Sequence, residues 1–564
     1  MVCHGCAADR RYRHLPDCGG LDHRGSPLHH AICAGNGRAR ILGQFRLSRD
    51  KQEDFACLGD GDGGDHGCRC PAAVHAATAA CSGHRNDRCG FGWGRKLYKV
   101  EDQLGSGPQP TDWRSLMSAA TNPFLSGIWA PMPAEVDLGA LAVSGEIPIA
   151  LRGHYLRMGP NPLKADPRFY HPFIGDGMVH GIEIADGKAN WYRSRFIRSH
   201  RAAAQLGVIP APGVRHGPGD TVNTSVGVVA GRILGMVEGG STPVALAADL
   251  STQDYTDFDG TLAGAFSAHP HRDPLTGEYH AITYQWMEPG KAAHVVIDRS
   301  GKVVREEPLG LQHGPMLHDC AFTARYVLIF DMPAAFNAKA AAAGSPFPYS
   351  WQPALPCRVG LMPRHGNAKD IIWCDVPLSY VYHAANAYDA EDGRVILDVC
   401  AFSSMFNADG DRNRGLERWV IDPLTRQVDV TSIDAATQEF PRIDERRFGQ
   451  QHRLITTLSQ PIEPTDPAPG GSALYLHDLE TGAKQVHDFG AGCFPGEFMF
   501  IPCAPDSAEG DGWLIGLVID INSDTTDLVI LDVQSFAGPP VARVHLPHRI
   551  PPGFHGNWVA DTAT

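Results

Sequence analysis

The stretch MVHGIEIADGKANWYRSRFI, residues 178–197, contains two runs of alternating apolar and polar residues on either side of Asp186-Gly187. Alternation with a period of two is typical of a β-strand that buries one face. Asp-Gly between two such runs is typical of a tight hairpin turn, because both turn positions require positive φ angles. The stretch therefore predicts two antiparallel strands joined by a short turn.

The same order of strand, glycine-containing turn and strand recurs along most of the chain, with almost no amphipathic helix. Further examples are SVGVVAGRILGMVE (225–238), HVVIDRSGKVVREEPL (294–309), NAYDAEDGRVILDVCAF (386–402), LYLHDLETGAKQVHDF (474–489) and DLVILDVQSFAGPPVARVHL (527–546). A small barrel is too short for so many hairpins, and a sandwich of this size would split into domains. Radial repetition of small sheets, a β-propeller, accommodates them. We therefore predict an all-β fold with residues 106–564 as a single β-propeller domain, although the weak repeats do not give the number of blades.

The composition limits the class of protein. The 62 glycines and 43 prolines among 564 residues agree with many turns, and the net charge of -14 argues against nucleic-acid binding. There is no apolar run long enough for a transmembrane helix, and the first 20 residues lack the apolar core of a signal peptide. We expect a cytoplasmic protein. If its substrate is apolar, we expect the protein to bind peripherally to the inner face of a membrane and to collect the substrate there without spanning the membrane.

Residues 1–105 have a different character, with nine of the 15 cysteines and no sustained strand or helix period. The pairs Cys3-x-x-Cys6 and Cys68-x-Cys70 could belong to a zinc site, but their spacings match no standard zinc knuckle. We expect this segment to be a disordered extension, or the result of a start codon assigned too far upstream. The other six cysteines are scattered, which fits a reducing compartment.

Four histidines lie at the edges of apolar strands, each beside a turn-forming residue. They are His269, His318, His383 and His555. The strands of a propeller begin near the central axis, so residues far apart in sequence can meet there. A histidine at a strand edge is more often structural than a ligand, and the chain contains 27 of them. Both interpretations remain open from the histidines alone.

Three glutamates in apolar strand contexts favour the metal site. They are Glu238 in RILGMVEGGSTPVAL, Glu439 in QEFPRID and Glu497 in CFPGEFMFIP. A buried carboxylate is costly unless it is paired. Histidine ligands usually donate their second N–H to a carboxylate, which fixes the tautomer. A buried glutamate that faces a metal-bound histidine would satisfy both groups.

Several of these stretches resemble the carotenoid cleavage oxygenases, the family that includes proteins like retinal pigment epithelial membrane protein. The matching stretches, in chain order, are GHYLRMGPNPL (153–163), FIGDGMVHGIEI (173–184), SAHPHRDPLTGE (267–278), MLHDCAFT (316–323), YHAANAYD (382–389), EFPRI (439–443) and GFHGNWV (553–559). The resemblance covers roughly residues 120–562 and is strongest to bacterial carotenoid and apocarotenoid cleavers.

The resemblance implies a seven-bladed β-propeller, capped by loops and short helices over an axial Fe(II). By motif, the iron ligands would be His269, His318, His383 and His555, and the carboxylates behind them would be Glu238, Glu439 and Glu497. Thr224, in DTVNTSVGVV, falls where many members place a threonine whose methyl group crowds an open iron position.

The implied reaction is cleavage of one C=C bond of a carotenoid or apocarotenoid by O2, with two carbonyl products. It could pass through a dioxetane or an epoxide-like intermediate. Most mononuclear non-haem iron oxygenases use two histidines and one carboxylate. Four neutral imidazoles instead leave Fe(II) its full charge and up to two open positions. The alkene supplies the electrons, and the sequence accordingly contains no dinucleotide-binding glycine motif and no P-loop.

The segment DMPAAFNAKAAAAGSPFPYSW, residues 331–351, interrupts the strand pattern. It combines Ala-rich helix formers with Phe336, Phe347, Tyr349 and Trp351. Two interpretations apply equally: a surface loop that packs on its own aromatic side chains, or a lid that touches the membrane at the mouth of a substrate tunnel.

Three alternative functions compete with this one. A lignostilbene-type dioxygenase of the same fold would need a tyrosine and a lysine to hold a phenolic hydroxyl, and the sequence does not identify such a pair. A propeller hydrolase or lactonase would need carboxylate or asparagine ligands for Ca²⁺. A non-catalytic binding scaffold would have no reason to carry four histidines in this arrangement.

Overall fold

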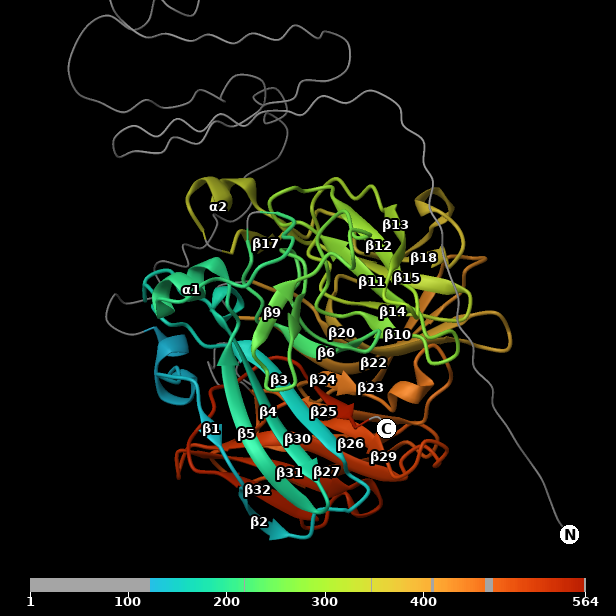
Figure 1. Ribbon diagram of the computed structural model, residues 1–564. Coiled ribbons are helices and arrows are strands. Elements are labelled where there is room, and N and C mark those ends of the chain that lie inside the picture. Colours follow the sequence, from blue (N-terminus) through green and yellow to red (C-terminus); the bar gives the residue numbers. More distant parts are fainter. Residues whose placement is uncertain (1–121, 218, 346, 407–409, 462–469, 562–564) are drawn as a thin grey trace, which may run out of the picture. The chain divides into compact units, whose positions relative to one another are not determined.

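The computed structural model describes residues 122–217, 219–345, 347–406, 410–461 and 470–561. Within these ranges, seven antiparallel sheets form the blades of a β-propeller (Figure 1). The predicted all-β fold and the blade number implied by the resemblance are therefore confirmed. The segment 1–105, with its cysteine pairs, lies outside the described residues, and its separation from the domain stays a prediction.

Five blades are four-stranded sheets built from consecutive stretches of chain. Their strands are β6 (Ser225–Val229), β7 (Arg232–Met236), β8 (Val244–Leu246) and β9 (Thr252–Tyr255); β10 (His271–Arg272), β11 (Tyr279–Tyr284), β12 (Ala292–Ile297) and β13 (Val303–Pro308); β14 (Cys320–Phe322), β15 (Tyr326–Asp331), β18 (Arg358–Pro363) and β19 (Ile372–Asp375); β20 (Tyr380–Asp389), β21 (Val395–Phe402), β22 (Asn413–Ile421) and β23 (Val428–Asp434); and β24 (Gln438–Arg442), β25 (Leu454–Ser459), β26 (Ala473–Asp478) and β27 (Ala483–Asp488).

The other two blades combine strands from both ends of the described chain. One contains β1 (Asp137–Leu138), β5 (Lys188–Phe196), β4 (Gly177–Ala185), β3 (Gly153–Pro160) and β33 (Gly556–Ala560). The other contains β2 (Ala142–Gly145), β32 (Ala542–Leu546), β31 (Thr525–Asp532), β30 (Gly512–Asp520), β28 (Cys493–Pro495) and β29 (Met499–Pro502). β33 pairs with β3, and β2 pairs with β32. In each of these two blades, a strand from the start of the described chain therefore pairs with a strand from its end, and these pairings close the ring.

The hairpin of β4 and β5 forms as the sequence predicts. Ala185 pairs with Lys188, so the connecting loop consists of Asp186 and Gly187 alone. Their φ angles are 53° and 70°, the left-handed values that this tight turn requires. Aspartate and glycine tolerate these angles better than other residues, which explains why the turn falls here.

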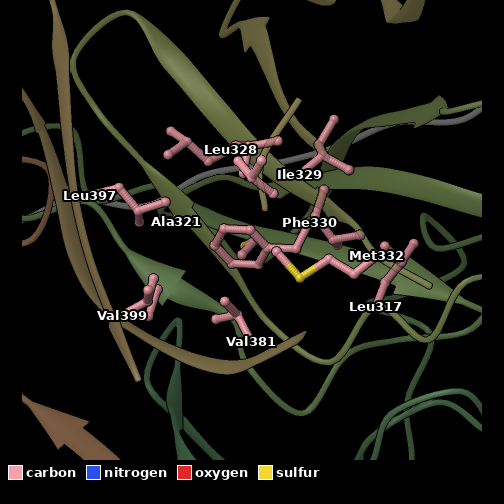
Figure 2. Packing of buried hydrophobic residues seen from close by; sticks show 14 of the residues in the cluster. Leu317, Ala321, Leu328, Ile329, Phe330, Met332, Val381, Leu397 and Val399 are labelled. Atoms are coloured by element: carbon pink, nitrogen blue, oxygen red, sulfur yellow. The ribbon is translucent and has the colours of Figure 1, made fainter. Parts of the chain in front are cut away.

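Neighbouring blades pack face to face, and inner strands such as β11 and β21 are buried on both sides, whereas outer strands such as β27 are largely exposed. Figure 2 shows one such cluster, where Leu328 and Phe330 of β15 lie with Val381 of β20 and with Leu397 and Val399 of β21. All five side chains are buried. Each fully buried side chain of this kind contributes about 1.5–3 kcal/mol, so these contacts hold the blades in fixed positions.

Short helices and one small hairpin leave the blades and form a cap. They are the 3-10 helices η3 (Pro123–Leu125), η4 (Gly127–Trp129) and η5 (Pro172–Ile174), the helices α1 (His200–Leu206) and α2 (Ala338–Ala342), and the paired strands β16 (Ala334–Phe336) and β17 (Tyr349–Trp351). Further 3-10 helices are η6 (Ala368–Asp370), η7 (Glu445–Arg447) and η8 (Val533–Ser535). Among the described residues, no helix is long and apolar enough to cross a membrane.

Candidate metal centre

The four predicted histidines come from four different blades and meet. His269 lies two residues before β10, His318 two residues before β14, His383 within β20, and His555 directly before β33. These strands form edges of their sheets and begin at the propeller axis. One nitrogen of each histidine lies within 4.8 Å of the others, so the structure brings all four side chains into one cluster.

The Nε2 atoms of the cluster face one another. Those of His269 and His318 are 3.1 Å apart, those of His318 and His383 are 3.0 Å apart, and those of His383 and His555 are 3.1 Å apart. With metal–nitrogen bonds of about 2.1 Å, nitrogens bound at right angles are about 3.0 Å apart, whereas tetrahedral nitrogens are about 3.4 Å apart. The observed spacing therefore matches ligands at right angles.

Each of the three predicted glutamates contacts the outer nitrogen of one histidine. Glu238 Oε2 lies 2.8 Å from His318 Nδ1, Glu439 Oε2 lies 2.6 Å from His383 Nδ1, and Glu497 Oε1 lies 3.2 Å from His555 Nδ1. His269 has no carboxylate partner among the described residues; its backbone N–H donates to the Ser267 hydroxyl at 3.0 Å.

These contacts fix the tautomers of the histidines. A carboxylate only accepts, so each of the three Nδ1 atoms carries the donated proton, and the Nε2 atom of a neutral ring keeps its lone pair. The lone pairs of several buried rings then point toward one place, where only a cation would relieve their repulsion. The donor set therefore fits a divalent metal ion, which the four Nε2 atoms would hold.

Burial and nearby charges shift the pKa values of the cluster in different directions. Burial lowers the pKa of His269 well below its usual value, and burial also lowers that of His555. Burial by itself would raise the pKa of Glu497, but Arg442 and His555 outweigh it and bring the value to about 2. Burial would lower the pKa of His383, yet Glu439 raises it. The glutamate behind His555 is thus ionised at neutral pH.

Thr224 lies beside the cluster, directly before β6. Its backbone carbonyl accepts the N–H of His555 at 3.0 Å, and its hydroxyl donates to the Asn223 side chain at 3.0 Å. Thr224 is buried and lines the cavity described next. Thr224 thus lies close to His555, and its predicted role of crowding a metal position stays a prediction.

A cavity of about 580 Å³ opens from the cluster under the cap. His318, His383 and His555 lie in its wall. Its aromatic lining residues are Phe124, Trp129, Phe173, Tyr284, Trp286, Phe347, Tyr349, Tyr382, Phe402, Phe440 and Phe554. Such walls would bind an extended apolar molecule by burying its surface. The histidines of the cluster would then lie beside the bound molecule.

The segment 331–351 contributes to this cavity from above. Phe347 and Tyr349 line it, with ring centroids 5.4 Å apart, and Phe336 packs against Tyr349 at 6.2 Å. Trp351 packs partly buried against the hydrophobic core. Phe347 and Tyr349 thus form part of the cavity wall, and Phe336 and Trp351 are half-buried. Contact of this segment with a membrane stays a prediction.

A second, polar cavity of about 460 Å³ reaches the cluster from another direction. His269, His271 and Asp319 line it, and so do His383 and His555, which also line the apolar cavity on their other side. The cluster consequently lies between a space suited to an apolar substrate and a space suited to water.

Two charged residues near the cluster, the buried Asp319 and the half-buried Arg442, were not predicted. Asp319 accepts from the backbone N–H of Ala384 at 3.0 Å and contacts His271 Nε2 at 2.6 Å, so it joins the strand of His318 to the strand of His383. Arg442 contacts Glu497 at 3.4 Å. The sequence did carry a signal, because Asp319 follows His318 within an apolar run and Arg442 follows Glu439 by three positions.

The fold and the site together define a β-propeller with an axial histidine cluster, and the comparisons with known proteins agree. The family described as retinal pigment epithelial membrane protein matches residues 129–560. A carotenoid cleavage oxygenase of Mycobacterium tuberculosis is 38% identical over 499 residues, which cover 78% of this chain and 98% of the relative. The chain belongs to this family, the carotenoid cleavage oxygenases.

Solved structures show the same fold over nearly their whole length. The lignostilbene dioxygenase of Pseudomonas brassicacearum matches with a TM-score of 0.71 and 28% identity, covering 79% of this chain and 100% of that one. The cobalt-substituted apocarotenoid oxygenase of Synechocystis matches with a TM-score of 0.66 and 28% identity, covering 76% of this chain and 97% of that one.

Proposed function

We propose that this protein is an Fe(II)-dependent dioxygenase that cleaves one C=C bond of a carotenoid or apocarotenoid with O2. The observation that carries this proposal is the convergence of four imidazole Nε2 atoms beside an aromatic cavity, with three of the four histidines in its wall. The names of the Mycobacterium tuberculosis and Synechocystis proteins support the substrate class. As a member of this family, the protein is an oxidoreductase that incorporates oxygen from O2.

The spacing of the histidines supports iron over zinc. Structural zinc prefers four tetrahedral ligands, which would lie farther apart than the 3.0–3.1 Å between neighbouring Nε2 atoms here. Ligands at right angles suit a six-coordinate ion with positions left for other molecules. When bound, Fe(II) would supply the means to activate O2 beside the alkene. Both oxygen atoms enter the products, and the four electrons come from the C=C bond.

The chain's own residues would hold the reactants rather than transfer protons. Glu238, Glu439 and Glu497 accept the Nδ1 protons, so the rings stay oriented with their Nε2 atoms toward the centre of the cluster. The aromatic walls bury a polyene at roughly 0.8 kcal/mol for each CH2-sized group. The position of the substrate along the cavity would then decide which double bond meets the metal centre.

A lignostilbene-type activity is the second candidate, because the Pseudomonas brassicacearum enzyme of that name has the same fold. Tyr284, Tyr349 and Tyr382 line the cavity, but no lysine does among the residues that the structure describes. The pair of tyrosine and lysine expected for a phenolic stilbene is therefore incomplete, which favours the carotenoid substrate. A calcium-dependent hydrolase is disfavoured, because the axial cluster consists of histidines.

One assay separates these candidates. The protein is loaded with Fe(II) without oxygen, O2 is admitted with β-apo-carotenal or with resveratrol, and the loss of polyene or stilbene absorbance is followed. We expect fast loss with the polyene and slow loss with the stilbene. Faster loss with resveratrol would reverse the assignment, and no loss with either substrate would contradict the dioxygenase proposal.

We also propose peripheral contact with the inner face of a membrane, from which a polyene would enter. Val208 and Ile209 lie beyond Gly207, the residue that caps α1, and are 45% and 88% exposed. Arg201 of α1 lines the cavity, so these exposed apolar side chains lie near a wall of the substrate space. Exposed apolar side chains beside a cavity for an apolar substrate could insert into the membrane interface and anchor the protein there.

A further inference from the structure

The apolar cavity has a polar end where two blades meet. Asp411, Asn413 and Gln460 line it there. Asn413 begins β22 and donates to the Gln438 carbonyl of the next blade at 2.8 Å, and the Gln460 N–H donates to the Thr437 carbonyl at 2.9 Å. These contacts place the three side chains at one end of the cavity, beside the strand that carries Glu439.

Asp411 lacks a partner for part of its carboxyl group. Its Oδ1 accepts the backbone N–H of Phe406 at 2.7 Å, and no donor approaches its Oδ2 within the described ranges. Burial raises the pKa of Asp411 to about 6, because this single backbone contact does not compensate for desolvation. Asp411 is half-buried and lines a cavity with aromatic walls, so its Oδ2 is suited to a ligand that supplies a donor.

The other polar groups at this end do not supply that donor. Asn413 uses its amide N–H for Gln438 and its Oδ1 for the Gly415 N–H at 2.7 Å. Gln460 donates to no side chain or carbonyl through its amide in the described part of the chain. Asp411 is consequently an acceptor that remains open toward a molecule in the cavity, and its charge distinguishes it from the neutral amide of Gln460.

This end is also close to the metal centre. The ring of Tyr382 lies 5.3 Å from the ring of His318 and 5.6 Å from that of Phe402, measured between centroids. Phe402 pairs with Asn413 across the sheet. A ring bound at Asp411 would therefore extend its conjugated chain past the histidines.

We propose that Asp411 accepts a hydrogen bond from a hydroxyl group on the terminal ring of the substrate. This inference rests on the proposed function and narrows its substrate class to ring-hydroxylated molecules. A carboxylate accepts and does not donate, so it selects a hydroxyl and gives nothing to a plain hydrocarbon ring. The hydroxyl could belong to a hydroxylated apocarotenoid or to a phenolic stilbene, which share this chemistry.

The test measures binding without turnover. Trp129 and Trp286 line the cavity, so quenching of their fluorescence reports occupancy. The Fe(II)-loaded full chain is titrated without oxygen with two matched pairs: β-apo-carotenal and its ring-hydroxylated derivative, and trans-stilbene and its para-hydroxy derivative. We expect the wild type to bind the hydroxylated member of one pair at least about tenfold more tightly, as for a hydrogen bond to a charged group.

Variants then assign the preference to one side chain. Asp411→Ala should abolish the preference for the hydroxylated ligand, so that both members of the pair bind about equally. Asp411→Asn keeps an acceptor for the Phe406 N–H, so it should reduce the preference while preserving the fold. Asp392→Ala is the matched control, because Asp392 is an exposed aspartate in the turn between β20 and β21 of the same blade. Its preference should equal that of the wild type.

The outcomes separate this inference from the proposed function. The pair that shows the preference identifies the source of the hydroxyl. An equal preference in the wild type and in both Asp411 variants would overturn the inference, and so would the absence of any preference in the wild type. A preference that depends on Asp411, followed by no cleavage when O2 is admitted, would support the inference and refute the dioxygenase proposal.

Discussion

Glu439 shows how a single carboxylate orients a metal ligand. Its Oε2 receives both the His383 Nδ1 proton and the backbone N–H of Phe440. Its Oε1 is buried without a partner among the described residues. Both hydrogen bonds to Glu439 therefore fall on the oxygen that faces His383, which contacts the other three histidines of the cluster.

Replacement of Glu439 by glutamine should weaken metal binding without removing a ligand. In Glu439→Gln, the new amide would accept from His383 only by placing its NH2 group at the position of Oε1, where no acceptor lies among the described residues. We expect iron affinity and turnover to fall by about 10–100-fold. Anaerobic Fe(II) titration measures the first, and unchanged affinity in a folded variant would show that Glu439 has no part in orienting His383.

At the scale of the elements, the cap decides how a substrate reaches the site. Phe347 stacks on His171 with ring centroids 5.5 Å apart and lines the cavity. We expect Phe347→Ser to lower turnover of detergent-solubilised and membrane-delivered polyene alike, since the aromatic wall is lost in both assays. A loss confined to membrane-delivered substrate would indicate that Phe347 contacts lipid instead.

The exposed end of α1 gives a separate prediction. Ile209→Ser should reduce sedimentation of the protein with phospholipid vesicles and reduce cleavage of polyene dissolved in them, while cleavage in detergent stays near the wild-type rate. The matched control is Leu424→Ser, because Leu424 is 91% exposed in the turn between β22 and β23. Equal vesicle binding by the wild type and Ile209→Ser would refute the proposed membrane contact.

Local features of the elements could be predicted from the sequence, whereas their partners could not. The turn at Asp186-Gly187 depends only on adjacent residues, so its hairpin was predictable. His555 pairs with Glu497 and His383 pairs with Glu439 only because separate blades pack together. The sequence therefore identifies the candidate histidines and glutamates, but not which glutamate contacts which histidine. Asp411 follows a glycine in a polar stretch typical of a turn, so nothing in the sequence distinguished it from a surface residue.

At the scale of the whole molecule, buried neutral histidines make stability depend on pH. Burial lowers the pKa of His171 to about 4, that of His280 to about 3 and that of His477 to about 4. In the unfolded chain these groups bind protons below about pH 6.5. The unfolded state then binds more protons than the folded state, so stability falls as pH decreases from about 6.5 to about 4.

The expected result is a thermal unfolding midpoint that decreases steadily over this pH range in the metal-free protein. Calorimetry or circular dichroism measures it, and a variant with His280→Gln should show a weaker dependence, because one of the three groups no longer titrates. A midpoint that is constant, or that rises toward pH 4, would contradict the burial of these histidines in the neutral form.

The four-histidine centre is the central claim for the whole molecule, because it uses residues that only the closed propeller brings together. The most direct test is the iron content of His555→Ala after anaerobic Fe(II) loading, measured with its rate of β-apo-carotenal cleavage on admission of O2. The wild type should hold one iron per chain and cleave the polyene, and the folded variant should lose most of both. Full iron content and full turnover in folded His555→Ala would contradict the account.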